Sequence, residues 1–165
     1  MYNTATWVYT YGLIFRRRNR FDASGRTQRM ASIPASFHDL FDRETFAHFA
    51  TKMPDGTPQV TPVWVDYDVD ADRVLVNTAR GRQKEQNVNR DPTVGLSMVD
   101  PDNPYRFVSV RGEVDALTEE VAVEHANQLA RRYMDVEEYP GLESEEGARV
   151  QIRIRPDDVV ASGTD

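Results

Sequence analysis

The 165-residue sequence contains no cysteine, only two lysines, and no apolar run long enough to cross a lipid bilayer. The absence of cysteine excludes disulfides, thiolate metal ligands and thiol nucleophiles. A membrane-spanning helix would need a run of about 20 apolar residues. Hydrophobic residues still make up 39% of the chain, which is enough to build a core. The composition therefore predicts one globular domain and not a disordered chain.

The common nucleotide-binding and hydrolase motifs are also missing. The sequence has no G-x-G-x-x-G after a strand, no G-x-x-x-x-G-K-[ST], no G-x-S-x-G and no H-E-x-x-H. Its three histidines, His38, His48 and His125, show no metal-ligand spacing. The acidic run 135–147 lacks the Asp/Asn/Gly spacing of a Ca²⁺ loop. We therefore expect no metal site and no catalytic nucleophile.

Charge is distributed unevenly along the chain. Residues 1–29 carry six arginines against a single acid, whereas residues 30–165 hold 14 cations against 26 acids. The acidic surface of the larger part repels nucleic acid and anionic membranes, so we expect neither as a partner. The ratio of 18 arginines to two lysines fits a halophilic source, in which salt screens the self-repulsion, and it fits GC-rich codon usage equally well.

The first 29 residues differ from the rest of the chain. The apolar stretch 5–15 precedes its arginine cluster, whereas a secretory signal has its cations first. We therefore expect a cytoplasmic protein in which Met30 is the true start and residues 1–29 form a non-globular extension. Residues 30–165 would then form a single domain. A nucleic-acid-binding arm is the alternative for the extension, but few aromatic residues interleave its arginines.

The remaining chain reads as strands joined mostly by tight turns. The strand-like ranges are 45–53, 59–67, 73–78, 93–99, 105–117 and 150–155. Pro54-Asp55-Gly56 has the chemistry of a hairpin turn between the first two. The segments 59–67 and 93–99 are apolar on both faces, and a flat sheet would leave one of those faces in water. The pattern predicts a mainly β fold, a six-stranded antiparallel meander closed into a small barrel with a helix packed at its side; a homodimer would bury the second apolar face.

Helices are expected to be few. Residues 36–44 predict a short helix with Ser36 as its N-cap. The polar segment 79–91 is compatible with a helix that stops before a proline. Residues 118–134, with Thr118 as N-cap and cations in the last turn, predict the one long helix, which would pack beside the barrel.

One group of polar residues has the chemistry of a phosphate site. Asn77 and Thr78 end a predicted strand, and Gly81-Arg82-Gln83-Lys84 follows at the start of the polar helix. A helix start offers free N–H groups and a partial positive charge. Arg82 adds a two-pronged donor and Lys84 a compact point charge. The alternative is a solvated basic turn.

The segment Thr61-Pro62-Val63-Trp64 adds a place for a planar ring. Pro62 cannot donate to the ladder of its predicted strand, so main-chain groups beside it stay free. A planar heterocycle could dock against them, with Trp64 as a wall. The alternative is that Trp64 belongs to the core.

The order and spacing of these motifs resemble those of the pyridoxamine 5'-phosphate oxidase-like proteins, and most of all their branch that uses the deazaflavin coenzyme F420. The matching residues are Phe49-Ala50-Thr51, DGTPQVTPVW at 55–64, Asn77-Thr78, Lys84, Asn87, Asp91-Pro92 and VSVRG at 108–112. The similarity covers roughly residues 33–163. It implies a split β-barrel that dimerises and binds a flavin or deazaflavin between the subunits.

The resemblance also implies cofactor-binding roles, residue by residue. The ring of the cofactor would lie beside Thr61, Pro62, Val63 and Trp64. The ribityl chain or phosphate would contact Asn77 and Thr78, and the phosphate would be held by Arg82 and Lys84. The cofactor of the partner subunit would be reached by Arg106. Flavin-using oxidases of the family have an Arg-Lys pair where this chain has Gln83-Lys84, and a cation where it has Thr61. The resemblance therefore favours F420 over FMN.

These observations lead to one hypothesis with three alternatives. The hypothesis is an F420-dependent oxidoreductase that transfers a hydride between the reduced deazaflavin and a small organic acceptor. No protein acid or base is assigned, because the hydride chemistry resides in the cofactor. The alternatives are an FMN-binding flavoprotein reductase of the same fold, a non-catalytic protein that binds F420 or haem, and a barrel without a ligand.

Overall fold

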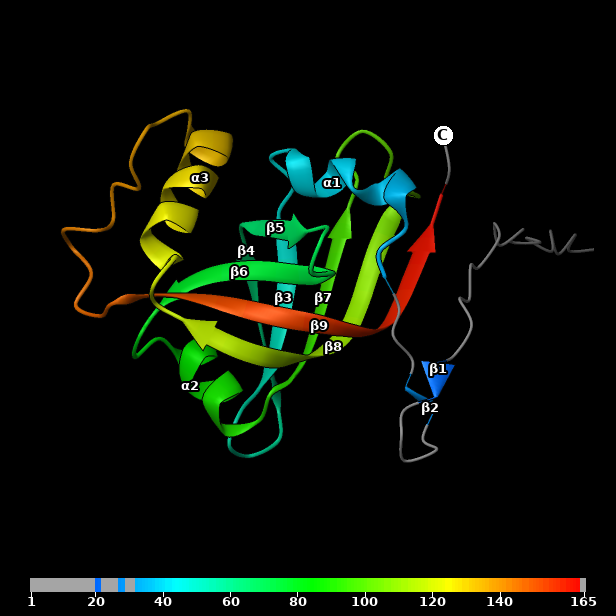
Figure 1. Cartoon of the computed structure of the whole chain (residues 1–165), viewed down its shortest axis with the longest axis horizontal. Coiled ribbons are helices and arrows are strands. Elements are labelled where there is room, and N and C mark those ends of the chain that lie inside the picture. The colour runs from blue at the N-terminus through cyan, green and yellow to red at the C-terminus, as the bar shows by residue number, and fades with distance from the viewer. Residues whose placement is uncertain (1–19, 22–26, 29–31, 164–165) are drawn as a thin grey trace, which may run out of the picture.

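The computed structural model describes residues 20–21, 27–28 and 32–163 (Figure 1). The strands are β1 (Arg20–Phe21), β2 (Thr27–Gln28), β3 (Ala47–Lys52), β4 (Pro58–Val63), β5 (Val65–Asp68), β6 (Arg73–Ala79), β7 (Thr93–Val99), β8 (Phe107–Thr118) and β9 (Arg149–Ser162). The helices are the 3-10 turn η1 (Ala35–Phe37), α1 (Asp39–Asp42), α2 (Gln83–Arg90) and α3 (Ala122–Met134). Within these described ranges, no helix has the length and apolar character needed to span a membrane. The expected extension 1–29 and start at Met30 fall outside the described residues, except that β1 pairs with β2.

The main sheet is antiparallel and contains seven strands in the order β4-β3-β7-β8-β9-β6-β5. The mainly β fold expected from the sequence is confirmed. The expected single strand 59–67 is two strands, β4 and β5, so the sheet has one strand more than expected. The order is also not a simple meander, because β3 pairs with β7 and β6 pairs with β9 across long stretches of sequence.

The break at Trp64 explains how the sheet curls. β4 and β5 lie at opposite edges of the strand order, yet only Trp64 separates them in the chain. The sheet therefore curls until its two edges approach each other at this residue. Figure 1 shows the result, with β6 and β9 crossing in front of β3, β4 and β7. Pro62 lies in the edge strand β4, where its missing N–H interrupts no interior ladder.

The core fills the inside of this half-barrel. Val65, Val74, Val108 and Ile152 are fully buried there, and α1 adds residues that include Phe41. Alternation along the strands places these side chains on one face of the curled sheet. Burial of this apolar area supplies the main driving force for folding.

The helix starts differ from those expected. Ser36 is no N-cap, because it lies inside the turn η1, which follows Pro34. Thr118 does not cap α3 either: β8 keeps its pairing with β9 through Thr118, opposite Gln151, and the helix begins only at Ala122. Pairing of β8 with β9 therefore keeps Thr118 in a strand, although its type favours the N-cap of a helix.

The outer face of β3, β4 and β7 combines the small residues Ala50, Gly95 and Ser97 with His48 and exposed apolar side chains. His48 of β3 stands in register with Pro62 of β4 and Ser97 of β7. At the borders, Val60 is 56% and Val99 is 46% exposed. The expectation that β7 is apolar on both faces holds for its inner face, whereas its outer face is small rather than strongly apolar.

Candidate functional site: a cationic cleft at the seam of the sheet

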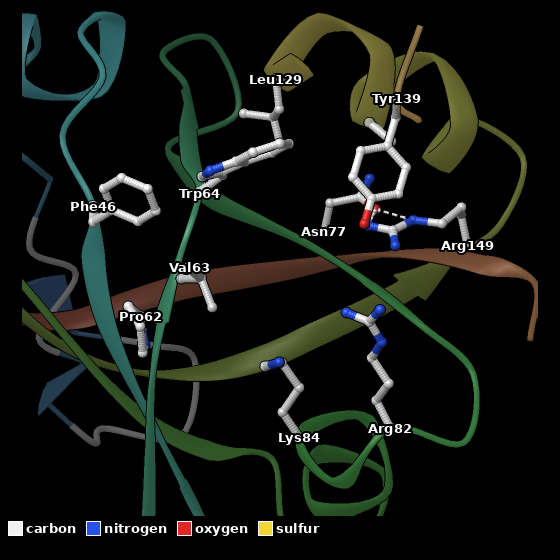
Figure 2. A pocket seen from close by; sticks show the side chains of 11 residues that line it. Phe46, Pro62, Val63, Trp64, Asn77, Arg82, Lys84, Leu129, Tyr139 and Arg149 are labelled. Atoms are coloured by element: carbon white, nitrogen blue, oxygen red, sulfur yellow. Dashed lines mark hydrogen bonds between the residues drawn. The ribbon is translucent and has the colours of Figure 1, made fainter. Parts of the chain in front are cut away.

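A cleft of about 180 Å³ lies where the edges of the curled sheet approach each other (Figure 2). Its lining comes from seven parts of the chain: Phe46, Pro62, Val63, Trp64, Asn77, Arg82, Lys84, Ala126, Leu129, Tyr139 and Arg149. Figure 2 shows an aromatic and apolar side around Trp64 and Phe46, and a cationic side formed by Arg82, Lys84 and Arg149. An amphipathic cleft of this kind suits a ligand that has an apolar ring at one end and an anionic group at the other.

Stacked aromatic rings form the apolar side. The ring of Trp64 lies parallel to that of Tyr133, with centroids 5.2 Å apart, and meets the edge of Tyr139 at 5.9 Å. The Tyr133 hydroxyl donates to the carbonyl oxygen of Thr45 at 2.7 Å, which holds its ring in place. Burial raises the pKa of this phenol above its usual value. Phe46 packs its ring against Tyr133 at 5.5 Å and is itself 52% exposed.

The cationic side rests on a buried arginine. Arg149 Nε donates to Asn77 Oδ1 at 2.8 Å, and its Nη2 donates to the same oxygen. Asn77 in turn donates from Nδ2 to the carbonyl oxygen of Ala122 at 2.7 Å, and its Nδ2 lies 3.1 Å from His125 Nδ1. The Arg149 guanidinium also lies over the Tyr139 ring. These contacts fix the side chain of Arg149, which is only 7% exposed.

Lys84 has no hydrogen-bond or ion-pair partner among the described residues, although it points into the cleft from α2 (Figure 2). Burial lowers the pKa of its ammonium, and the positive charges of Arg82 and Arg149 lower it further. An unpaired, partly buried cation beside two guanidiniums is costly in the free protein. This cost would be relieved by an anion from outside the chain.

The start of α2 brings two cationic side chains to the cleft. Arg82 occupies the N-cap position, and Lys84 lies in the first turn. The N–H of Gly81, just before the N-cap, donates to Glu85 Oε2 at 3.0 Å. The Glu85 carboxylate also accepts from Arg80 Nη1 at 2.8 Å, so it is occupied by contacts outside the cleft.

Six of the residues assigned by sequence come together in this cleft, and three do not. Pro62, Val63, Trp64, Asn77, Arg82 and Lys84 line it. Thr61 of β4 is half-buried and Thr78 of β6 is fully buried, and neither Oγ1 has a hydrogen-bond partner among the described residues. Neither threonine lines the cleft.

Arg106 lies in a separate, buried ion network. Its guanidinium donates to Asp100 at 2.7 Å, to Asp39 at 2.5 Å and to the carbonyl oxygen of Ser36 at 2.6 Å. The same group lies over the ring of Phe37, 5.0 Å from its centroid. Both Nη atoms of Arg106 are therefore engaged by contacts within the chain. To bind a cofactor in the partner subunit, Arg106 would have to break these contacts.

The histidines behave as expected for structural residues. His38 contacts the carbonyl oxygen of Ile33 at 3.0 Å, and His48 lies exposed on β3. His125 is buried behind Asn77, and burial lowers its pKa to about 4. Among the described residues, no group of His, Asp or Glu side chains is arranged to hold a metal ion.

Sequence reasoning missed the two residues that complete the charged side. Arg149 was not assigned, although it directly precedes the alternating last strand; its polar character on a buried strand was the available signal. Tyr139 lies in the acidic run 135–147 and is tied there by its N–H, which donates to Asn127 Oδ1 at 2.9 Å. Nothing in its local sequence marked it.

A curled antiparallel half-barrel whose edges approach at a cationic cleft defines a split β-barrel protein. The model of a family described as pyridoxamine 5'-phosphate oxidase matches residues 33–162. The chain belongs to this family. No curated protein sequence matches it.

Solved structures with the same fold carry different titles. One titled F420 reductase is 34% identical, covers 77% of this chain and 98% of its own, and superposes with a TM-score of 0.67. The conserved hypothetical protein Rv2991 from Mycobacterium tuberculosis is 23% identical, with coverage of 87% and 89% and a TM-score of 0.64. HutZ, a haem storage protein from Vibrio cholerae, is 14% identical, with coverage of 81% and 96% and a TM-score of 0.60. The last two similarities concern the fold alone.

Proposed function

We propose that this protein is a cytoplasmic oxidoreductase that binds coenzyme F420 and transfers a hydride between the reduced deazaflavin and a small organic acceptor. The observation that carries the proposal is the unpaired Lys84 ammonium in a cleft that it shares with Arg82, Arg149 and an aromatic wall. A ligand that combines a planar ring with a phosphate complements both sides of this cleft.

The residues present fit such a cofactor. Lys84 and Arg82 would hold its phosphate, because charge-assisted hydrogen bonds to phosphate are the strongest that side chains offer. Trp64, Phe46 and Leu129 would exclude water from the ring. When bound, the deazaflavin itself supplies the hydride chemistry, so the protein needs to bind and orient it and no side-chain nucleophile is required.

Two observations favour F420 over FMN. The structure titled F420 reductase is 34% identical to this chain over 77% of its length. In addition, Gln83 and Thr61 carry no charge at positions where flavin-using members of the family have cations. FMN remains the alternative cofactor, and its binding is an outcome of the test below.

The proposal includes a homodimer. A complete site for a ligand of this size usually has about 300–1,000 Å³, whereas the cleft of one chain has about 180 Å³. Its rim continues through Phe46 and Pro62 onto the outer face of β3, β4 and β7, whose small side chains allow close approach of a second sheet. A second copy seated on that face would enlarge the cleft into a full site.

Titration of the purified full-length chain with F420, FMN and haem tests the proposal. We expect saturable binding of F420 with one site per chain, FMN at least about tenfold weaker, and oxidation of reduced F420 in the presence of small quinones or enones. Absence of binding to F420 and FMN would refute the proposal. If FMN binds more tightly than F420, the cofactor is a flavin. If F420 binds but no acceptor is reduced, the protein is a carrier of F420 and not an oxidoreductase.

A further inference from the structure

The carboxylate of Glu145 lies between the two guanidiniums of the cleft. Its Oε1 accepts from Arg82 Nη2 at 2.6 Å and from Arg149 Nη1 at 2.8 Å. Its Oε2 accepts from the same Nη1 at 2.6 Å, and the Tyr139 hydroxyl donates to Oε1 at 3.2 Å. Donors from two guanidiniums thus converge on one carboxylate oxygen, and a phosphate oxygen accepts hydrogen bonds in the same way.

Glu145 is exceptional within its own segment. The run 135–147 carries the carboxylates Asp135, Glu137, Glu138, Glu143, Glu145 and Glu146. Five of these residues are exposed, whereas the side chain of Glu145 is only 10% exposed. A solvated acidic loop has no need to bury one of its charges, because burial of a charge is costly unless it is paired. The inward position of Glu145 therefore follows from the two cations that it meets.

The surroundings allow this carboxylate to leave without disturbing Arg149, and its departure frees the guanidinium of Arg82 for the ligand. Arg149 contacts Asn77 through Nε and Nη2 and uses only Nη1 for Glu145, so its guanidinium stays in place when Nη1 is released. The run itself contains no helix or strand. Around Glu145 its backbone bonds are local, from Leu142 to Tyr139 and from Ser144 and Glu145 to Gly141, whereas its first part is tied to α3 by the Tyr139 N–H on Asn127 and by Arg131 on the Glu137 carbonyl.

We propose that Glu145, which is not itself a lining residue of the cleft, is a built-in competitor that occupies the anion position between Arg82 and Arg149 in the free protein and is displaced by the phosphate group of the ligand. The identity of that ligand as F420 rests on the proposed function. The exchange favours phosphate because an incoming phosphate also meets Lys84, for which no described residue serves as a partner. A ring without a phosphate gains nothing from displacing Glu145. Glu145 therefore weakens the binding of phosphate-bearing ligands and leaves that of their dephosphorylated analogues unchanged.

A purely orienting role for Glu145 makes the opposite prediction. If the carboxylate stayed in place and only positioned Arg82 and Arg149, its neutralisation would loosen both cations and weaken binding. If it competes with the ligand, its neutralisation strengthens binding. The sign of the change in affinity therefore separates the two roles.

The test compares Glu145→Gln with Glu143→Gln, which removes the same charge from an exposed position of the same run. F420, FMN and riboflavin are titrated into the full-length wild type and both variants. We expect E145Q to bind F420 and FMN about tenfold more tightly than the wild type, with riboflavin changed less than twofold. E143Q should stay within about twofold of the wild type for each. Equal or weaker binding of F420 and FMN by E145Q overturns the proposal.

Titration with inorganic pyrophosphate distinguishes failure of the Glu145 competitor from failure of the proposed F420 binding. Tighter pyrophosphate binding by E145Q, in a protein that binds neither F420 nor FMN, would support the competitor and refute the cofactor. Binding of F420 by the wild type with no gain in E145Q would support the cofactor and refute the competitor.

Should E145Q fail to fold, Tyr139→Phe removes only the neutral hydrogen bond to the carboxylate. That variant should bind pyrophosphate about twofold more tightly, and unchanged or weaker binding would count against the competitor.

Discussion

Arg149 of β9 and Asn77 of β6 meet diagonally across the pairing of these two strands, with Arg149 Nε 2.8 Å from Asn77 Oδ1, whereas Gln151 is the residue in register with Asn77. This bond joins residues that are 72 positions apart in the chain. It holds a cation at the base of the cleft through side chains of two interior strands of the sheet. Rigid strands position a charge more accurately than a loop does, because the backbone around them is fixed by hydrogen bonds on both sides.

Replacement of Lys84 by alanine should raise the dissociation constant for F420 about tenfold, because the phosphate loses a cleft cation that has no partner among the residues described. Lys52→Ala is the matched control. Lys52 is the other lysine of the chain, is half-exposed and pairs with Asp91 at 2.8 Å. Fluorescence titrations at two salt concentrations measure both variants. Equal losses in K84A and K52A would remove Lys84 from the site.

Affinity for F420 should fall as the pH rises into the alkaline range. Burial, together with Arg82 and Arg149, lowers the pKa of Lys84 in the free protein, so its ammonium loses its proton at a lower pH than an exposed lysine does. Only the protonated form attracts the phosphate, and binding is therefore strongest below that pKa. Titrations from pH 7 to pH 10 should show this decline in the wild type and a flatter profile in K84A. Parallel profiles would contradict the assignment.

His125 should make the fold sensitive to moderately acidic pH. Burial lowers its pKa from 6.5 to about 4, so the unfolded chain binds the proton more tightly than the folded one. Stability is then fully present above pH 6.5 and falls as the pH drops toward 4, by about 3 kcal/mol from this residue. His125→Gln should lack this part of the loss in denaturant unfolding at pH 7 and pH 4. His48→Gln, at an exposed position, should unfold like the wild type at both values.

Replacement of Arg106 by methionine should lower the free energy of unfolding by about 3 kcal/mol, because Asp100 would remain buried without its main partner. Affinity for F420 should not change in this variant. Arg111→Met removes an exposed arginine that pairs with Asp158, and we expect a loss below about 1 kcal/mol. Weaker F420 binding by a folded R106M dimer would restore the cofactor role that the family resemblance implies.

Ser97→Arg should prevent the proposed dimer. Ser97 lies in the middle of the outer face, in register with His48 on one side and Ser109 on the other. A large charged side chain at this position would hold a second sheet away and leave its own charge unpaired. Light scattering after size-exclusion chromatography should show a dimer for the wild type and a monomer for S97R. A monomeric wild type that binds F420 would show that one chain is sufficient.

The local pattern anticipated a good part of this structure. Alternation of polar and apolar residues marked the strands, Pro54-Asp55-Gly56 marked a turn, and Pro62 marked an interrupted ladder that proved to lie at the sheet edge. The group of Asn77, Arg82 and Lys84 was also visible, because its members lie within eight positions of one another. Periodicity shows which face of a strand is buried, and it needs no knowledge of the strand's neighbours.

The failures share one origin. The expected strand 59–67 continued through Trp64 because its residues are uniformly strand-like, and only the pairing of β4 with β3 and of β5 with β6 reveals the break. Thr118 looked like a helix cap until its pairing with β9 was known. In each case a contact with a distant segment outweighed the local preference.

Residue types and their spacing by themselves determined the mainly β character, the acidic charge, the lack of thiol chemistry, and the cations that precede and begin α2. Only the tertiary structure decided that Arg149 joins those cations, that Glu145 turns inward between two guanidiniums, and that Lys84 finds no partner within the part of the chain that the structure describes. The reason is physical: a side chain's partners depend on which strands become neighbours, and curling of the sheet brings together residues whose positions in the sequence carry no sign of their contact.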